Sequence, residues 1–198
     1  MRTFNTLTIC LLAFFATSVV SAQDFDSQNS LEFKVQLLSD NTYGVFVKPD
    51  HTISPSSKTQ TGSGQVTIVV PTDFSFSNFK NVAGTWVENA RVDAPTEASK
   101  NSYVSFGFVV DNPRIQLFSN EETLLFTFTT EAAFNGQVAL FDNNNDPFMT
   151  PNSFGSNPGN DLGVIDLGAK GGMAYYTYAR NYSTDLEKML EFSTLAAK

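Results

Sequence analysis

The side chains best suited to hold a ligand lie in the polar run DNNND that begins at Asp142. Oxygen-bearing side chains alternate along this run, and proteins hold Ca²⁺ with clustered carboxylate and amide oxygens. The candidate calcium ligands are Asp142, Asn144, Asp146 and Asp161. Asp161 comes from the far end of the same turn-rich stretch, residues 142–163. Calcium is the one cofactor that the residues suggest.

This run is not an EF-hand loop, because Pro147 and Ser153 stand where that loop requires glycine and a bidentate glutamate. Asn and Asp side chains also form turns by hydrogen bonding to their own backbone. A calcium site of another geometry and a solvated turn therefore both remain open.

Side chains for catalysis are scarce. His51 is the single histidine, and no Gly-x-Ser-x-Gly elbow accompanies it. A typical zinc enzyme needs more histidines than this. Glu121 and Glu122 are adjacent, so on a strand they would point to opposite faces. We expect a protein that is not an enzyme.

Aromatic side chains are the alternative route to a binding site, because sugars stack on exposed rings. The candidate ligand-binding residues are Trp86, Tyr176 and Tyr178, of which the two tyrosines would share one face of a strand. Aromatic rings also fill β-sheet cores. Exposure decides between these two roles, and the sequence does not give it.

The elements that must position these residues are strands. In Leu124–Thr129 the even positions are apolar, a period of two that indicates a strand with one buried face. The polar stretch Lys48–Ser63 is expected to be a loop. The expected strands cover Leu31–Leu38, Tyr43–Val47, Gln65–Val70, Phe74–Phe79, Thr85–Val92, Tyr103–Val110, Leu124–Thr129, Gln137–Phe141, Val164–Leu167 and Met173–Tyr178.

The first residues are expected to be an export signal. Arg2 precedes the short apolar run Leu7–Phe15, and the small residues Ser21 and Ala22 stand where signal peptidase cleaves. This is the pattern of a cleaved signal peptide over residues 1–22. This removes Cys10, the single cysteine, so the mature chain would contain no disulfide. A polar, flexible arm is expected over residues 23–30. Location is therefore expected to be secreted, periplasmic or extracellular, with no transmembrane segment after cleavage.

Near the C-terminus the spacing of the apolar residues changes from that of a strand to that of a helix. Leu186, Met189 and Leu190 recur at helical spacing, and Thr184 with Glu187 fits a capping box. We expect the β-domain to cover residues 31–180 and a short helix to lie within residues 181–198. The helix would pack on its own domain or serve as a handle for a partner.

Composition excludes one class of partner. The 198 residues carry a net charge of −8, which argues against nucleic acid because phosphates need a basic surface. Hydrophobic residues make up 41% and include 19 phenylalanines, enough for a core rich in phenylalanine.

Two motifs carry a family resemblance. Gly64–Pro71 reads GQVTIVVP, and Glu121–Phe128 reads EETLLFTF and is followed by an Asn-Gly turn. With the order of the other strands, these resemble the cohesin family and related jelly-roll β-sandwich domains of exported bacterial proteins, of the Bacteroidota type. The resemblance covers roughly residues 31–178 and implies a non-catalytic module.

The expected fold is therefore all-β: a nine- or ten-stranded antiparallel β-sandwich of the jelly-roll, cohesin-like kind, with a short C-terminal helix. The expected function is a secreted or cell-surface interaction or structural module that binds a protein or glycan partner of the envelope. A carbohydrate-binding module is one alternative. A self-associating subunit of an extracellular assembly, built through the N-terminal arm or C-terminal helix, is another.

Overall fold

The computed structural model describes residues 30–39, 41–50, 54–131 and 137–183. This part of the chain is all-β, with ten strands and one 3₁₀ turn, η1. The elements are β1 (Ser30–Ser39), β2 (Thr42–Pro49), β3 (Thr59–Pro71), β4 (Ser77–Asn81), β5 (Thr85–Asp93), η1 (Thr96–Ala98), β6 (Asn101–Val110), β7 (Thr123–Thr129), β8 (Ala139–Leu140), β9 (Asp161–Asp166) and β10 (Ala174–Asn181).

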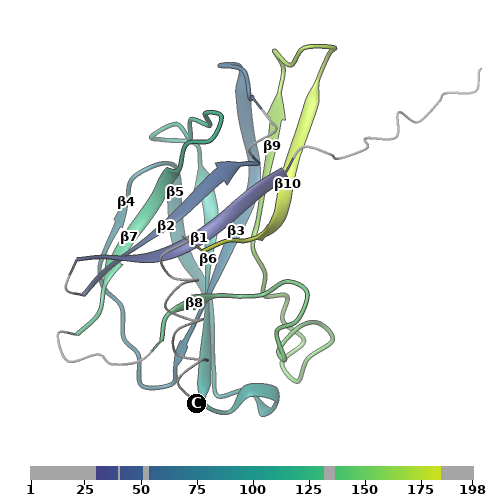
Figure 1. The fold of residues 1–198 in the computed structure, drawn as a ribbon. Coiled ribbons are helices and arrows are strands. Elements are labelled where there is room, and N and C mark those ends of the chain that lie inside the picture. The colour runs from purple at the N-terminus through teal and green to yellow at the C-terminus, as the bar shows by residue number, and fades with distance from the viewer. Residues whose placement is uncertain (1–29, 40, 51–53, 132–136, 184–198) are drawn as a thin grey trace, which may run out of the picture.

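Nine of these strands form one continuous hydrogen-bonded path in the order β4-β7-β2-β1-β10-β9-β3-β6-β5, and β8 pairs with β3 (Figure 1). Most neighbours in this path are far apart in the sequence. The first part of β3 and the β9–β10 hairpin extend beyond the other strands at one end of the molecule (Figure 1).

The sheet is mixed, so the expectation of a wholly antiparallel arrangement is wrong at one pairing. β1 and β10 run parallel, from Ser30 opposite Thr177 to Phe33 opposite Asn181. β10 bends from β9, its antiparallel partner at Ala174–Tyr176, to β1 at its second half. The chain therefore enters its first and last strands from the same end.

The two ends of the path, β4 and β5, are consecutive in the sequence and meet through a side chain. The Asn81 carboxamide accepts a hydrogen bond from the Trp86 N–H (2.9 Å) and donates one to the Trp86 carbonyl (3.3 Å). An amide side chain thus pairs with the backbone as a neighbouring strand would. The sheet is nearly closed at this point.

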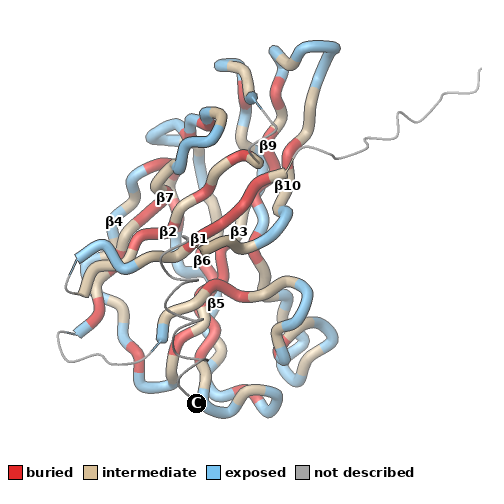
Figure 2. The backbone as a smooth tube through the Cα atoms, viewed as in Figure 1, coloured by how far each residue is buried: buried red, intermediate tan, exposed pale blue. Residues whose placement is uncertain are grey.

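The core lies inside this nearly closed sheet and is dominated by aromatic rings (Figure 2). Phe106 stacks on Phe79 with ring centroids 4.9 Å apart, and Phe126 lies 5.1 Å from Phe106 and 5.7 Å from Trp86. Such pairs add to the burial energy because edge and offset contacts suit the ring quadrupoles. Many of the phenylalanines in the sequence thus lie in the core or pack against it.

The positions of most strands agree with the sequence patterns, with one clear error. β3 begins at Thr59, so the last part of Lys48–Ser63 is strand and not loop. Thr59–Thr61 pairs with β9, which gives this polar sequence a strand partner that its composition does not indicate. The strand expected after Phe74 begins at Ser77, and only Ala139–Leu140 forms the one expected over Gln137–Phe141.

Several expectations concern residues outside the described ranges: the signal peptide over 1–22 with Cys10, the arm from Gln23, His51, and the C-terminal helix. Ser30, expected to end the arm, already belongs to β1, and β10 continues to Asn181. In the described ranges, no helix has the length and apolar character needed to span a membrane.

The turn of the β9–β10 hairpin is held by a buried carboxylate at the end of β9. Asp166 accepts hydrogen bonds from the Ser56 hydroxyl, from the Ser56 N–H (2.6 Å) and from the Gly168 N–H (2.9 Å). Burial by itself raises the pKa of Asp166, but these hydrogen bonds outweigh it and hold the pKa below its usual value. The carboxylate thus stabilises both the turn before β3 and the turn after β9.

We predict that Asp166→Asn lowers the free energy of unfolding at pH 7 by about 1–3 kcal/mol, the cost of weakening a buried charge-assisted network. A depressed pKa contributes stability above the unfolded value of about 4, and that contribution is lost as the pH falls through the folded value. Urea denaturation from pH 7 to pH 3 should therefore show the difference from the wild type shrinking in acid. Asp73→Asn, at an exposed position, is the matched control; an equal effect there would contradict the role given to Asp166.

Candidate functional site

The β9-β3-β6-β5 half of the sheet has an outer face that points away from the core. Along β6, residues 104, 106 and 108 pack in the core, so the residues between them face outward. Across the strands, Val87 of β5, Gly107 of β6, Gln65 of β3 and Asp161 of β9 form one outward row, because each is the register partner of the next. We call this surface face B.

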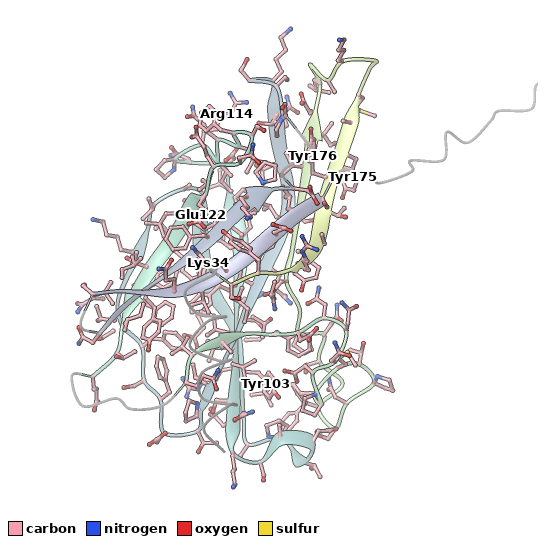
Figure 3. The ribbon with its side chains drawn as sticks, viewed as in Figure 1. Lys34, Tyr103, Arg114, Glu122, Tyr175 and Tyr176 are labelled. Carbon is pink, nitrogen blue, oxygen red and sulfur yellow. The ribbon has the colours of Figure 1, made fainter. Side chains whose placement is uncertain are left out.

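The connecting loop, Asp142–Asn160, folds back over part of face B. Tyr103, Phe141 and Phe148 form a second, smaller buried cluster under it. The rings of Tyr103 and Phe148 lie 4.6 Å apart (Tyr103 is labelled in Figure 3). Each buried phenylalanine stabilises by about 1.5–3 kcal/mol, so this cluster is enough to hold a loop without regular secondary structure.

Asn160 anchors the end of the connecting loop and is 1% exposed. Its carboxamide accepts from the Thr67 N–H (2.9 Å) and donates to the Phe141 carbonyl (2.7 Å) and to the Asn181 side chain (3.3 Å). Its own N–H donates to the Asn143 carboxamide (2.9 Å). One side chain therefore joins β3, the start of the loop and the end of β10.

The proposed calcium ligands lie in this loop region, but each carboxylate has a protein partner. Asp142 accepts from the Asn144 N–H (2.9 Å) and the Asn145 side chain (3.1 Å). Asp146 accepts from the Tyr103 hydroxyl and from the Phe148 N–H, both at 2.9 Å. Asp161 is exposed and accepts a long bond from the Tyr178 N–H (3.4 Å).

This geometry is that of a hydrogen-bonded turn, the alternative that the sequence left open. Among residues 30–39, 41–50, 54–131 and 137–183, no group of three or more acidic, histidine or cysteine side chains is placed to hold a metal ion. Calcium binding by Asp142, Asn144, Asp146 and Asp161 stays a prediction, and a change in melting temperature on adding Ca²⁺ would test it.

Two pKa shifts reflect the same contacts. The hydrogen bond from the Asn144 N–H, followed by that from the Asn145 side chain, holds the pKa of Asp142 below its usual value. Burial, followed by the bond to Asp146, raises the pKa of Tyr103 well above its usual value. Tyr103 is therefore a neutral donor that fixes the loop and does not serve as an acid or base near neutral pH.

A groove of about 560 Å³ lies between the connecting loop and the edges of β3 and β9. Its lining is polar but almost uncharged, and Asp161 is its one ionisable residue. Within the described part of the chain, the side chains of Ser63, Thr150 and Asn157 have no hydrogen-bond partner, so they are free to bind a ligand. Phe141, Met149 and Pro158 add apolar surface.

The other part of face B is left uncovered by the loop and is apolar. Val87 is 46% exposed and Val109 is 59% exposed. Gly107 lies between them, and the Asn89 side chain reaches over it: a Cβ added there would lie 2.9 Å from the Asn89 amide nitrogen. The two exposed valines therefore lie beside a glycine over which the Asn89 side chain reaches, and this surface continues to the groove through Gln65.

The aromatic residues proposed to bind sugar lie mostly inside the protein. Trp86 is 1% exposed and Tyr176 is 2% exposed, and both belong to the core cluster. Tyr178 is half-buried and packs on Phe33 with ring centroids 5.7 Å apart. Tyr176 and Tyr178 do share one face of β10, but it is the face that packs on the core, so the rings of Trp86 and Tyr176 offer no surface to a sugar.

Sequence reasoning did not single out Ser63, Gln65, Thr150 or Asn157. They are ordinary polar residues of turns and strand ends, and only the return of the connecting loop gathers them. The one available signal was the length of the turn-rich stretch 142–163, since long loops in compact domains are often functional.

Comparison of the chain with protein-family models, curated proteins and solved structures gave no match. Function is therefore inferred from the geometry of the chain itself.

We predict that Asn160→Ala lowers the free energy of unfolding by about 1–3 kcal/mol, because it leaves the buried Thr67 N–H without a partner and the Phe141 carbonyl with the Asn181 side chain as its remaining donor. Urea denaturation followed by tryptophan fluorescence measures this. Asn144→Ala, an exposed position in the same loop, should change stability by less than about 0.5 kcal/mol. Equal effects of the two substitutions would contradict the anchoring role of Asn160.

Proposed function

We propose that the chain is a secreted or cell-surface binding module without catalytic activity, folded as a jelly-roll-like β-sandwich and engaging a protein partner through face B. The single observation that carries this proposal is the exposed apolar surface at Val87 and Val109, beside a groove of about 560 Å³. The cohesin-like resemblance of the sequence points to the same class of module.

The chemistry of face B suits a protein partner. Specific interfaces have an apolar centre, few charges at that centre and a polar rim. Val87, Gly107 and Val109 supply the centre, while Gln65 and Asp161 lie toward the groove. β5 carries a bulge between Glu88 and Ala90, which discourages pairing along the strand edge and leaves the face as the site of contact.

The groove also argues against hydrolysis as the function of this surface. Glycoside hydrolysis needs two facing carboxyl groups, and the groove has one acidic residue, Asp161. The uncharged hydrogen-bonding groups are suited to recognition and not to proton transfer.

Site-specific photo-crosslinking tests the protein-binding proposal. A photoreactive phenylalanine analogue at Val87 or Val109 should crosslink to one protein of a cell-envelope extract, and the same analogue at exposed Thr72 should not. Crosslinks that do not depend on position would contradict the proposal.

With the partner purified, Gly107→Arg should weaken binding at least about tenfold, or about 1.4 kcal/mol, because the long side chain covers the apolar centre. The added Cβ meets only the Asn89 side chain, so the melting temperature should stay close to that of the wild type. Thr72→Arg is the matched control for the added charge. Unchanged affinity in Gly107→Arg, measured by calorimetry, would place the interface elsewhere.

A second candidate function is binding of an uncharged oligosaccharide in the groove. The observation that favours it is the set of free side chains, Ser63, Thr150 and Asn157, around an apolar floor. Hydroxyl and carboxamide groups pair well with sugar hydroxyls. This places the carbohydrate site away from Trp86 and Tyr176.

For this candidate, we predict that a neutral glycan identified on an array loses about fivefold in affinity with Asn157→Ala and again with Thr150→Ala, since each removes one hydrogen bond worth about 1 kcal/mol. Ser99→Ala, an exposed position near η1, should leave affinity unchanged. Binding of acidic glycans alone, or binding that these substitutions do not affect, would contradict the site.

A further inference from the structure

The β10-β1-β2-β7 half of the sheet has its own outer face, called face A here, and it buries charge. Glu32 and Lys34 alternate with Leu31 and Phe33 of the core, so their side chains point away from the core. Yet Glu32 is 4% exposed and Lys34 is 2% exposed. Charged side chains on the outside of a sheet are ordinarily solvated, so their burial needs a cover.

Both residues lie in ion pairs that cross the sheet. The Lys34 ammonium bonds to both carboxylate oxygens of Glu122, at 2.7 and 2.8 Å (both are labelled in Figure 3). Glu32 accepts from the Arg180 guanidinium at 2.7 Å and lies 3.3 Å from the Lys48 ammonium. Arg180 and Lys48 flank Glu32 from β10 and β2, so every charge in this cluster has a partner of opposite sign.

Apolar side chains continue face A toward β7. Lys34, Phe46 and Leu124 form one row across three strands. Beside this row, the Leu124 and Leu38 side chains both lean over Gly44, each 2.9 Å from the position of an added Cβ. Leu38 is nevertheless 45% exposed, so an apolar surface remains open to packing there.

Tyr182 directs the chain onto face A after β10 ends. Its N–H donates to the Phe33 carbonyl (2.9 Å), and its ring lies 4.0 Å from the Lys48 ammonium and 5.4 Å from that of Lys34. Its hydroxyl is buried and has no hydrogen-bond partner in the described residues. Burial, followed by the nearby charge of Glu122, raises the pKa of Tyr182, so the hydroxyl stays neutral beside the Glu122 carboxylate.

We propose that residues 184–198 of the same chain dock on face A, with the Leu186, Met189 and Leu190 stripe packed against Phe46, Leu124 and Leu38. Face A buries charged side chains and exposes Leu38, and the segment whose sequence contains the apolar stripe follows it directly after Tyr182 and Ser183. The occupant is this chain's own C-terminal segment, acting in cis.

Length and charge both fit this occupant. Fifteen residues in a helix span about 22 Å at ~1.5 Å per residue, whereas crossing from β10 to β7 needs about 14 Å, three strand spacings of ~4.8 Å. Face A carries three basic side chains against two acidic ones in the cluster described above. The segment carries three acidic residues and two lysines, so the net charges are opposite: Asp185, Glu187, Glu191, Lys188 and Lys198.

Paramagnetic broadening in NMR tests the proposal without disturbing face A. In the full chain with Cys10→Ser, a nitroxide attached at Met189→Cys should cause loss of the amide signals of Gly44, Phe46 and Leu124 and spare those of Val87 and Gly107. The matched control is a nitroxide at Val109→Cys, which should give the reverse pattern because Val109 lies on face B. A Leu186→Glu, Leu190→Glu variant carrying the same label should recover the face A signals while the remaining spectrum keeps its dispersion.

Three outcomes would overturn the proposal. Retained signals of Gly44, Phe46 and Leu124 would place the segment elsewhere, and broadening of both faces would mean that it has no fixed site. A mixture of ¹⁵N-labelled chain and unlabelled, spin-labelled chain separates the remaining case: broadening in that mixture would mean that the segment docks on a second copy, as in an exchanged assembly.

Discussion

The parallel pairing of β1 with β10 is the interaction on which the rest of the structure depends. In the described residues it is the strand pairing that joins the β4-β7-β2-β1 strands to β10 and the β9-β3-β6-β5 strands, and the far ends of the path meet through the Asn81 side chain. It also positions both outer faces. Arg180 and Tyr182 leave this junction over face A, while Asn181 bonds to Asn160 and to the Phe141 carbonyl under the connecting loop.

The two outer faces differ in the chemistry of their side chains: face B is largely neutral, whereas face A contains a cluster of charges. On face B, the connecting loop covers part of the surface through its buried aromatic rings and the Asn160 hydrogen bonds. The groove and the surface at Val87 and Val109 remain exposed. On face A, the charge of Lys34 is taken out of water, which is costly even when the ammonium is paired, whereas its partner Glu122 keeps part of its side chain exposed. Such a pair contributes little net stability but penalises any arrangement that separates it. The charges on face A thus select one register of β1, β2 and the segment before β7.

Local patterns in the sequence were sufficient for most of the strands and for the aromatic core, because a period of two depends only on which face is buried. The neighbours of a strand depend on the whole chain, so neither the parallel partner of β1 nor the extension of β3 back to Thr59 has a local signature. Glu32 and Lys34 have the pattern of a solvated strand face, but their partners Arg180 and Glu122 lie far away in the sequence, so the sequence pattern does not predict their burial. The groove likewise forms from residues that share no pattern.

The position of β10 also has a consequence for the order of events in folding. Among the described strands β10 comes last in the sequence, yet it lies in the middle of the hydrogen-bonded path, between β1 and β9. A chain that lacks residues 174–181 can form hairpins but cannot join the two halves or complete the core. Folding must therefore follow synthesis of nearly the whole chain, and contacts of such large sequence separation place it in the range of milliseconds to seconds.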